Sequence, residues 1–239
     1  MSLLKANPKI TSETNFLDGQ VLLFNKPIRW SSFDVVKKVR GIIKSAKNIQ
    51  KIKVGHAGTL DPLADGLLIV CTGKFTKRIN EIQSQKKLYT GEITLGSTTP
   101  SYDKETEVDQ TFDISKITDK LIHKVSKKFE GKIMQKPPIF SALKREGKRL
   151  YQHAREGTKI EIQAREVEVE SFKMTSIEIP KITFEIICSK GTYIRSLAHD
   201  FGKELNNGAH LSSLRREMIG NFSLSDAISI DSFKENILK

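Results

Sequence analysis

Apolar residues recur along the chain with two different periods, which predicts a mixture of strands and helices. Short apolar runs over residues 19–25 and 66–71 are typical of buried strands. A helix is expected to begin at the two serines of residues 31–32. The apolar positions that we expect to form the core face of this helix are Phe33, Val36, Val39, Ile42 and Ile43.

The second half of the chain has the same mixed character. Residues 88–96 alternate between apolar and polar positions, as in a strand with one buried face. Two further strands are predicted over 161–179 and 181–188, and helices over 74–83 and 114–129. A short helix is expected at the end of the chain. The pattern therefore predicts a mixed α/β (α+β) fold, with an extended sheet and helices packed around it.

Length and composition describe an ordinary folded protein. The 239 residues, 38% of them hydrophobic, supply ample material for a core. No apolar run approaches the roughly 18 residues of a membrane span, and residues 1–18, polar and aperiodic, predict a flexible arm rather than a signal peptide. Cys71 and Cys188 lie in predicted strands without redox or zinc spacing. We therefore expect packing cysteines in a reducing compartment, and a cytoplasmic protein with no membrane contact.

Positive charge is the informative part of the composition. Lys and Arg total 40 against 28 Asp and Glu, a formal net charge of +12. Such an excess fits a polyanionic partner, because neutralised phosphates release counterions. Residues 131–151 combine Lys and Arg with aromatic residues, Pro and Gly, which suits RNA loops, although a strand-turn-helix with solvated charges would look the same. The candidate RNA-binding cations are Lys136, Lys144, Arg145, Lys148 and Arg149.

The segment over residues 55–68, GHAGTLDPLADGLL, presents one His and one Asp on a glycine-punctuated loop. Glycines permit backbone angles and close approaches that a side chain forbids, and Pro62 fixes the turn directly after Asp61. The strand that follows would anchor the loop from one side. From these residues alone, Asp61 is either a carboxylate at the mouth of a cleft or a local cap in a tight connecting turn.

This segment closely resembles the signature of the TruB family of tRNA pseudouridine synthases. Other family motifs follow in the family's order. They are the Lys-Pro pair at Lys26 and Pro27, the Lys-x-Tyr…Leu-Gly pattern over 87–96, Pro-x-x-Ser-Ala-Leu-Lys over 138–144, CSKGTYIRSLA over 188–198 and the motif over 210–216. The resemblance covers residues 19–222. It implies a pseudouridine synthase catalytic domain over 19–239, with a thumb insertion near 135–155.

The resemblance also implies roles for particular residues. Asp61 corresponds to the family's essential catalytic Asp, acting as a nucleophile or as a base on the ribose. Arg195 pairs with it and holds it ionised, while Lys26 and Pro27 support the loop. The residues that line the base pocket or stack on the uracil are Tyr89, Tyr193 and Leu214. His56 assists base flipping or fills the vacated space, or alternatively stabilises the loop by a hydrogen bond.

The expected activity is isomerisation of uridine 55 to pseudouridine in the T-arm of tRNA, by a monomer without cofactor or metal. Many family members continue into a C-terminal PUA domain, for which we expect no counterpart here. Three alternatives remain open. An RNA-binding module would not need Asp61. A glycoside hydrolase would need a second carboxylate, for which Asp65 is the nearby candidate. A guide-RNA-dependent subunit is expected to carry the additional C-terminal domain.

Overall fold

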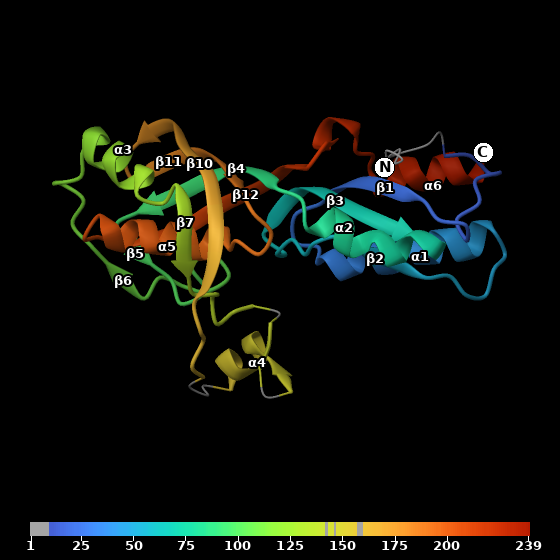
Figure 1. The fold of residues 1–239 in the computed structure, drawn as a ribbon, viewed down its shortest axis with the longest axis horizontal. Coiled ribbons are helices and arrows are strands. Elements are labelled where there is room, and N and C mark those ends of the chain that lie inside the picture. The colour runs from blue at the N-terminus through green and yellow to red at the C-terminus, as the bar shows by residue number, and fades with distance from the viewer. Residues whose placement is uncertain (1–9, 142, 146, 157–159) are drawn as a thin grey trace. The chain divides into compact units, whose positions relative to one another are not determined.

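The computed structural model describes residues 10–239 except 142, 146 and 157–159. The chain forms two compact units (Figure 1). Unit 1 contains residues 1–89 and 215–239, and unit 2 contains residues 90–214. The chain passes between the units within β4 (Lys87–Leu95) and again within β12 (Ala209–Ile219). The family resemblance instead implies one catalytic domain over 19–239.

Unit 1 is built on β1 (Val21–Lys26) and β3 (Ala64–Thr72), which pair antiparallel. The short strand β2 (Val54–His56) pairs with β3, and β13 (Phe222–Ser223) pairs with the end of β12. Leu22, Phe24, Leu68 and Val70 face α1 (Ser32–Ala46) and α6 (Ile230–Leu238). Val21, Leu23, Leu67 and Ile69 face the opposite side, toward η1 (Gly73–Arg78) and α2 (Ile79–Gln83). The strands therefore alternate between two cores, as the pleat of a sheet requires.

Helix α1 begins as the two serines predict. Ser31 is the N-cap, and it forms a capping box with Asp34. The buried stripe contains Val36, Val39, Ile42 and Ile43 as expected, but Phe33 is 60% exposed, and Val35 is buried in its place. The expectation for Phe33 is wrong because, at about 100° per residue, it lies about 120° around the axis from the centre of the stripe.

The described part of the N-terminal segment is packed. Ile10 and Phe16, which is 2% exposed, join the core formed by β1, β3 and α1. The carbonyl of Phe16 also accepts a hydrogen bond from the Thr72 hydroxyl at 2.9 Å. The expectation of a flexible arm is therefore wrong for residues 10–18, because two apolar side chains in a polar stretch suffice to anchor it. Residues 1–9 lie outside the described residues.

Unit 2 contains the strands predicted in the second half of the chain. They have the order β12, β4, β11 (Lys181–Cys188), β10 (Arg165–Glu178) and β7 (Gly131–Gln135). Register pairs Phe172 with Ile186 and Met174 with Phe184, and β10 pairs antiparallel with both neighbours. The longer helices of this unit are α3 (Asp119–Lys127) and α5 (Ile194–Glu204). Helix α3 is shorter than the predicted 114–129 because Thr118 caps it.

Smaller elements complete unit 2. β5 (Ser97–Thr98) pairs with β6 (Gln110–Thr111). The chain leaves the sheet after β7 and returns at β10, and between them lie β8 (Lys144–Arg145), β9 (Lys148–Arg149) and α4 (Leu150–Arg155) (Figure 1). The excursion contains most of the segment near 135–155 that is predicted to be a thumb insertion, and its role as a thumb stays a prediction.

Both cysteines are free and buried, and burial raises the pKa of Cys71 to about 12, as expected of a packing thiol. Within the described part of the chain, no helix is both long and apolar enough to cross a membrane.

Candidate active site

The loop that carries Asp61 is held by hydrogen bonds from several directions within unit 1. The Ser32 hydroxyl, on α1, donates to the carbonyl of Leu60 at 3.0 Å and accepts from the N–H of the same residue at 2.8 Å. The N–H of Arg29 donates to the carbonyl of Pro62 at 2.7 Å. The N–H of Ala64 donates to the carbonyl of Asp61 itself at 3.1 Å. Both peptide groups that flank Asp61 are therefore fixed, which favours a side chain with a defined direction.

Arg216 clamps the same loop from β12. Its guanidinium donates to the carbonyls of Leu67, Gly58 and Thr59, at 2.8, 3.1 and 3.4 Å respectively. The residue is 1% exposed. Strand and loop also pack closely: a Cβ on Gly66, which has a φ of +99°, would lie 2.5 Å from the carbonyl oxygen of Arg216. Gly66 is thus required both for its conformation and for this close approach.

Lys26 is fully buried at the end of β1 and is therefore not an exposed strand end. Its ammonium group donates to the carbonyls of Pro27 at 2.9 Å and Trp30 at 2.6 Å. Burial lowers the pKa of Lys26 to about 8, against the opposing effect of the carboxylates of Asp65 and Asp61. Lys26 therefore holds the turn after β1 and contributes positive charge near both carboxylates.

The other predicted site residues of unit 1 are His56, Pro27 and Tyr89. Burial, together with the charge of Arg216, lowers the pKa of His56, so that its imidazole is neutral near pH 7. Pro27 is exposed, and its carbonyl is the acceptor for Lys26. Tyr89 is buried on β4, on the face that the alternating pattern predicts.

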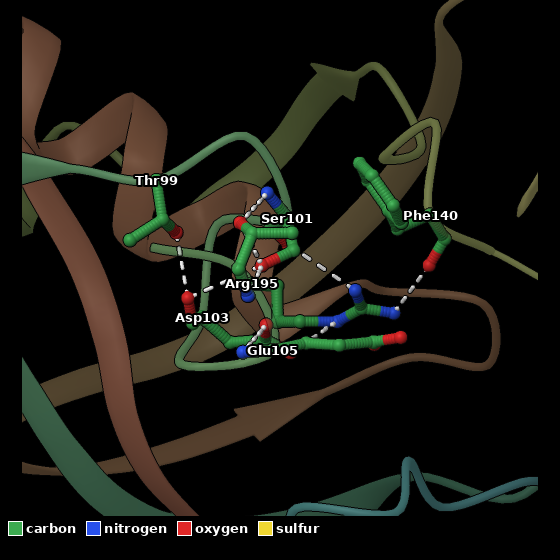
Figure 2. A network of polar contacts seen from close by, with 7 residues as sticks. Thr99, Ser101, Asp103, Glu105, Phe140 and Arg195 are labelled. Atoms are coloured by element: carbon green, nitrogen blue, oxygen red, sulfur yellow. Dashed lines mark hydrogen bonds and ion pairs between the residues drawn. The ribbon is translucent and has the colours of Figure 1, made fainter. Parts of the chain in front are cut away.

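Arg195 is the centre of a polar network in unit 2 (Figure 2). Its guanidinium donates to the carbonyls of Ser101 at 3.2 Å and Phe140 at 2.9 Å, and its Nε lies 3.5 Å from Oδ2 of Asp103. The other carboxylate oxygen of Asp103 accepts from the N–H of Glu105 at 2.9 Å. Arg195 is 3% exposed and Asp103 is 5% exposed, so this ion pair is screened little by water.

Asp103 is not among the site residues expected from the sequence. Residues 97–103 resemble a Thr- and Asp-rich turn of the family, but Pro100 and Tyr102 interrupt that pattern. The predicted pairing of Arg195 with Asp61 would join unit 2 to unit 1 and stays a prediction.

Tyr193 precedes α5 and is positioned by two residues from neighbouring strands. Gln135 accepts from the N–H of Tyr193 at 2.8 Å and donates to its carbonyl at 3.0 Å. The guanidinium of Arg165 lies 5.0 Å from the centre of the Tyr193 ring and bonds the carbonyl of Gly191. Gln135 and Arg165 face each other across β7 and β10. Leu214, the remaining predicted pocket residue, is half-buried on β12.

The predicted RNA-binding cations lie on the excursion between β7 and β10. Lys136 is exposed, and its carbonyl accepts from the Ser196 hydroxyl at 2.7 Å. Lys148 is exposed and pairs with Glu156 at 2.9 Å, and Arg149 is also exposed. The backbones of Lys144 and Arg145 pair with β9, while their side chains lie outside the described structure.

A metal centre is not evident in the part of the chain that the structure describes. No group of three or more His, Cys, Asp or Glu side chains there could hold an ion.

Comparison with known proteins identifies the class. Residues 44–194 match the family described as TruB family pseudouridylate synthase (N terminal domain). The chain belongs to this family, and it is therefore a pseudouridine synthase, an isomerase.

Individual relatives agree closely. The chain is 55% identical to tRNA pseudouridine synthase B of Flavobacterium johnsoniae over 223 residues, which cover 93% of this chain and 97% of the relative. It is 48% identical to tRNA pseudouridine synthase B of Phocaeicola vulgatus over 221 residues, covering 92% and 94% respectively.

Solved structures give the same fold. A chain of a Cbf5-Nop10-Gar1 complex is 27% identical, with a TM-score of 0.67, and the comparison covers 98% of this chain and 61% of the solved one. A chain of the archaeal box H/ACA sRNP Nop10-Cbf5 complex has a TM-score of 0.66 at 24% identity. This chain spans 60% of the length of that second structure. The predicted pseudouridine synthase fold is therefore confirmed.

Proposed function

We propose that this enzyme isomerises uridine 55 in the T-arm of tRNA to pseudouridine, as a monomer, with Asp61 as the catalytic residue. The observation that supports the proposal most directly is the loop around Asp61. Ser32, Arg29 and Arg216 fix its backbone, and Lys26 is buried beside it. The relatives' name, tRNA pseudouridine synthase B, supports tRNA as the substrate.

The reaction needs little besides a placed carboxylate. An N-glycosidic bond is exchanged for a C-glycosidic bond within one nucleotide, so no atom is gained or lost and no electron acceptor is required. Asp61 acts either as a nucleophile or as a base on the ribose. Either role depends on the angle at which the carboxylate meets the sugar, and a backbone fixed on both sides supplies that angle without reorganisation.

The target uridine must leave its stack before it can react. Aromatic and apolar side chains that replace the lost stacking lower this penalty. Tyr89, Tyr193 and Leu214 supply such surfaces, and the neutral imidazole of His56 enters the vacated space without carrying a second charge. Lys136, Lys148 and Arg149 are exposed cations that can contact phosphates of the T-arm.

Pseudouridine mapping on an unmodified tRNA transcript and on an isolated T-arm stem-loop tests the proposal. The wild type should modify position 55 in both RNAs without added metal. Asp61→Asn should lower the rate by about 10⁴-fold or more, because an amide neither attacks nor accepts a proton. Asp65→Asn is the matched control. Its carboxylate pairs with Arg215 at 3.0 Å, so most of the activity should remain.

Two outcomes contradict the proposal. Binding of tRNA by wild type and Asp61→Asn alike, with no pseudouridine from either, would leave an RNA-binding module. If the wild type released free uracil from the RNA and Asp65→Asn did not, the protein would be a hydrolase. Light scattering of the enzyme alone, at the assay concentration, measures its molar mass and so tests whether it is a monomer.

A further inference from the structure

A groove of about 670 Å³ lies along α1 and α6 in unit 1, and Asp61 is not among its lining residues. Helices α1 and α6 are in contact within this unit. The apolar lining consists of Trp30, Gly41, Ile42, Ala46 and Leu238. Leu238 is 62% exposed, so part of this apolar surface faces water. The volume lies within the range of pockets that hold small ligands or single nucleotides.

The rim of the groove is strongly basic. It carries Arg29, Lys37, Lys38 and Lys234 and one carboxylate, Asp34. That carboxylate accepts from the N–H of Ser31 at 2.9 Å and from the Ser31 hydroxyl at 2.6 Å. The carboxylate of Asp34 is therefore engaged in capping the N-terminus of α1, where the helix dipole also offsets its negative charge.

The cations of the rim are available to a ligand. The side chains of Lys37, Lys38 and Lys234 form no hydrogen bond or ion pair with any described residue. A rim of unpaired cations around a single capped carboxylate is complementary to a polyanion. An acidic peptide would satisfy the cations, but it has no particular need for the aromatic floor.

The apolar lining of the groove, which we call its floor, favours RNA over other polyanions. Trp30 is half-buried, and it is the single tryptophan of the chain. A flat aromatic surface beside cations is the arrangement that unpaired RNA uses, with bases stacked on rings and phosphates against lysines. A duplex keeps its base faces inside its stack and would leave the apolar floor uncovered.

The groove adjoins the loop that carries Asp61. Arg29, on the rim, donates its backbone N–H to the carbonyl of Pro62, the residue after Asp61. The backbone carbonyl of Trp30, on the floor, accepts a hydrogen bond from the ammonium group of Lys26. RNA in the groove would therefore be held by the same unit that presents the catalytic carboxylate.

We infer that the groove between α1 and α6 binds an unpaired segment of the RNA substrate, with a base against Trp30 and phosphates against Lys37, Lys38 and Lys234. The inference rests on the proposed function for the identity of the substrate. The groove adds affinity for RNA outside the reacting nucleotide.

The chain offers a way to fill the groove without disturbing the fold. A Cβ on Gly41 meets no atom within 4 Å, although the residue lies in the middle of α1. Gly41→Ala should stabilise the helix and leave the groove open, whereas Gly41→Leu projects a branched side chain into it. The two variants therefore separate blockage of the groove from a change in helix stability.

Trp30 fluorescence reports the groove directly, since no other tryptophan contributes. We would titrate the full chain with an oligouridylate of about ten nucleotides, a length typical of single-strand sites. Saturable quenching is expected, with an affinity that falls as salt rises. Lys37→Glu/Lys38→Glu and Gly41→Leu should each weaken binding about tenfold. Gly41→Ala and Lys51→Glu/Lys77→Glu, which reverses two exposed lysines of unit 1 outside the groove, should match the wild type. The same groove variants should raise the KM for tRNA more than they lower kcat.

Each opposing result overturns the inference. Absence of saturable quenching does so, as does quenching that the groove variants leave unchanged. Equal quenching by a polyglutamate peptide would indicate an acidic protein partner, and self-association accompanied by the same signal would indicate a second copy of the chain. If tRNA is modified without quenching by RNA, the groove inference fails alone. If the wild type forms no pseudouridine, the proposed function fails, and the titration still decides whether the groove binds RNA.

Discussion

Arg216 in unit 1 and Arg195 in unit 2 are both buried, and both donate to backbone carbonyl oxygens, but the groups around them differ. Every described side-chain hydrogen bond of Arg216 goes to a backbone carbonyl, either in the loop, at Gly58 and Thr59, or in β3, at Leu67. Arg195 bonds two carbonyls and also lies beside the carboxylate of Asp103. The first arginine fastens a loop and forms no ion pair with a carboxylate of any described residue, and burial together with its charge lowers the pKa of His56. The second shares its charge with an acid, so its role depends on that partner.

The sharpest test of this contrast is removal of the Arg216 clamp, which should have the largest effect. Arg216→Met leaves three carbonyls without their donor and should lower the free energy of unfolding by about 3–5 kcal/mol. The loop would then be loosely held, and activity should fall about 100-fold or more under conditions where the variant is folded. Urea unfolding and pseudouridine formation measure the two effects.

Arg215 is the matched control, since it is the adjacent residue on the same strand. It pairs with Asp65 at 3.0 Å and Glu217 at 3.4 Å at a partly exposed position. Arg215→Met should lower stability by about 1 kcal/mol or less. Equal losses from the two substitutions would show that Arg216 is not a special clamp. Should Arg216→Met fail to fold, Arg216→Lys, which keeps the charge on a single donor nitrogen in place of the guanidinium fork, still provides the comparison.

The pH dependence of stability tests the electrostatics of unit 1. The pKa of Lys26 is about 8 in the folded protein, through burial first and the charge of Arg216 in smaller part, against 10.5 as the ordinary value. Between these values the unfolded chain binds a proton that the folded chain does not, so the free energy of unfolding should rise with pH. The rise attributable to Lys26 should total about 3 kcal/mol.

Urea unfolding just below pH 8 and near pH 10 checks this rise. Lys26→Met should remove it, while Lys37→Met, which changes an exposed lysine, should retain it. Parallel pH profiles for wild type and Lys26→Met would contradict the burial argument.

A smaller effect is expected where an arginine keeps its carbonyl acceptors and loses a charged partner. Asp103→Asn retains an acceptor for the N–H of Glu105 but removes the negative charge beside Arg195. We expect a loss of about 1–2 kcal/mol in stability and a roughly tenfold fall in kcat with little change in KM, because Arg195 is then less well oriented.

Steady-state kinetics on tRNA measure this effect of Asp103→Asn. Asp109→Asn is the control, because its carboxylate accepts from the Thr98 hydroxyl at an exposed position, and it should leave both constants near wild type. A rise in KM without a fall in kcat would assign Asp103 to RNA binding instead.

Sequence patterns predict the elements whose periodicity is strong. Strands β1, β3, β4 and β11 follow from apolar runs or alternation, and α1 from a helical stripe. The pattern assigns no element to β12, because this strand carries polar residues and a fully buried arginine. A buried Arg216 is tolerated because carbonyls from a distant loop satisfy it, and local sequence contains no trace of those partners.

The residues of the candidate site also fall into two groups, those that the sequence predicts and those that it does not. Glycines and Pro62 mark the loop that presents Asp61, since those residue types have direct consequences for the backbone. Ser32 and Asp103 escape notice, because their roles depend on partners 28 residues away for Ser32, and on another element for Asp103. Site features that depend on backbone geometry can be predicted from the local sequence, whereas features that depend on tertiary contacts cannot.

The smallest expected effect concerns the support of Arg195 rather than its charge. Gln135, 1% exposed, bonds both the N–H and the carbonyl of Tyr193, and so fixes the residue that precedes α5, on which Arg195 lies. Gln135→Ala should lower the free energy of unfolding by about 1–2 kcal/mol and slow pseudouridine formation a few-fold, since α5 begins less rigidly. Gln152→Ala is the matched control, because that glutamine also bonds a backbone N–H, of Arg149, but at an exposed position worth a few tenths of a kcal/mol. Thermal unfolding and single-turnover assays compare the two variants. Equal effects would mean that burial of the amide adds nothing, whereas a loss of rate in Gln135→Ala without a loss of stability would mean that Tyr193 itself, and not the start of α5, is what Gln135 positions.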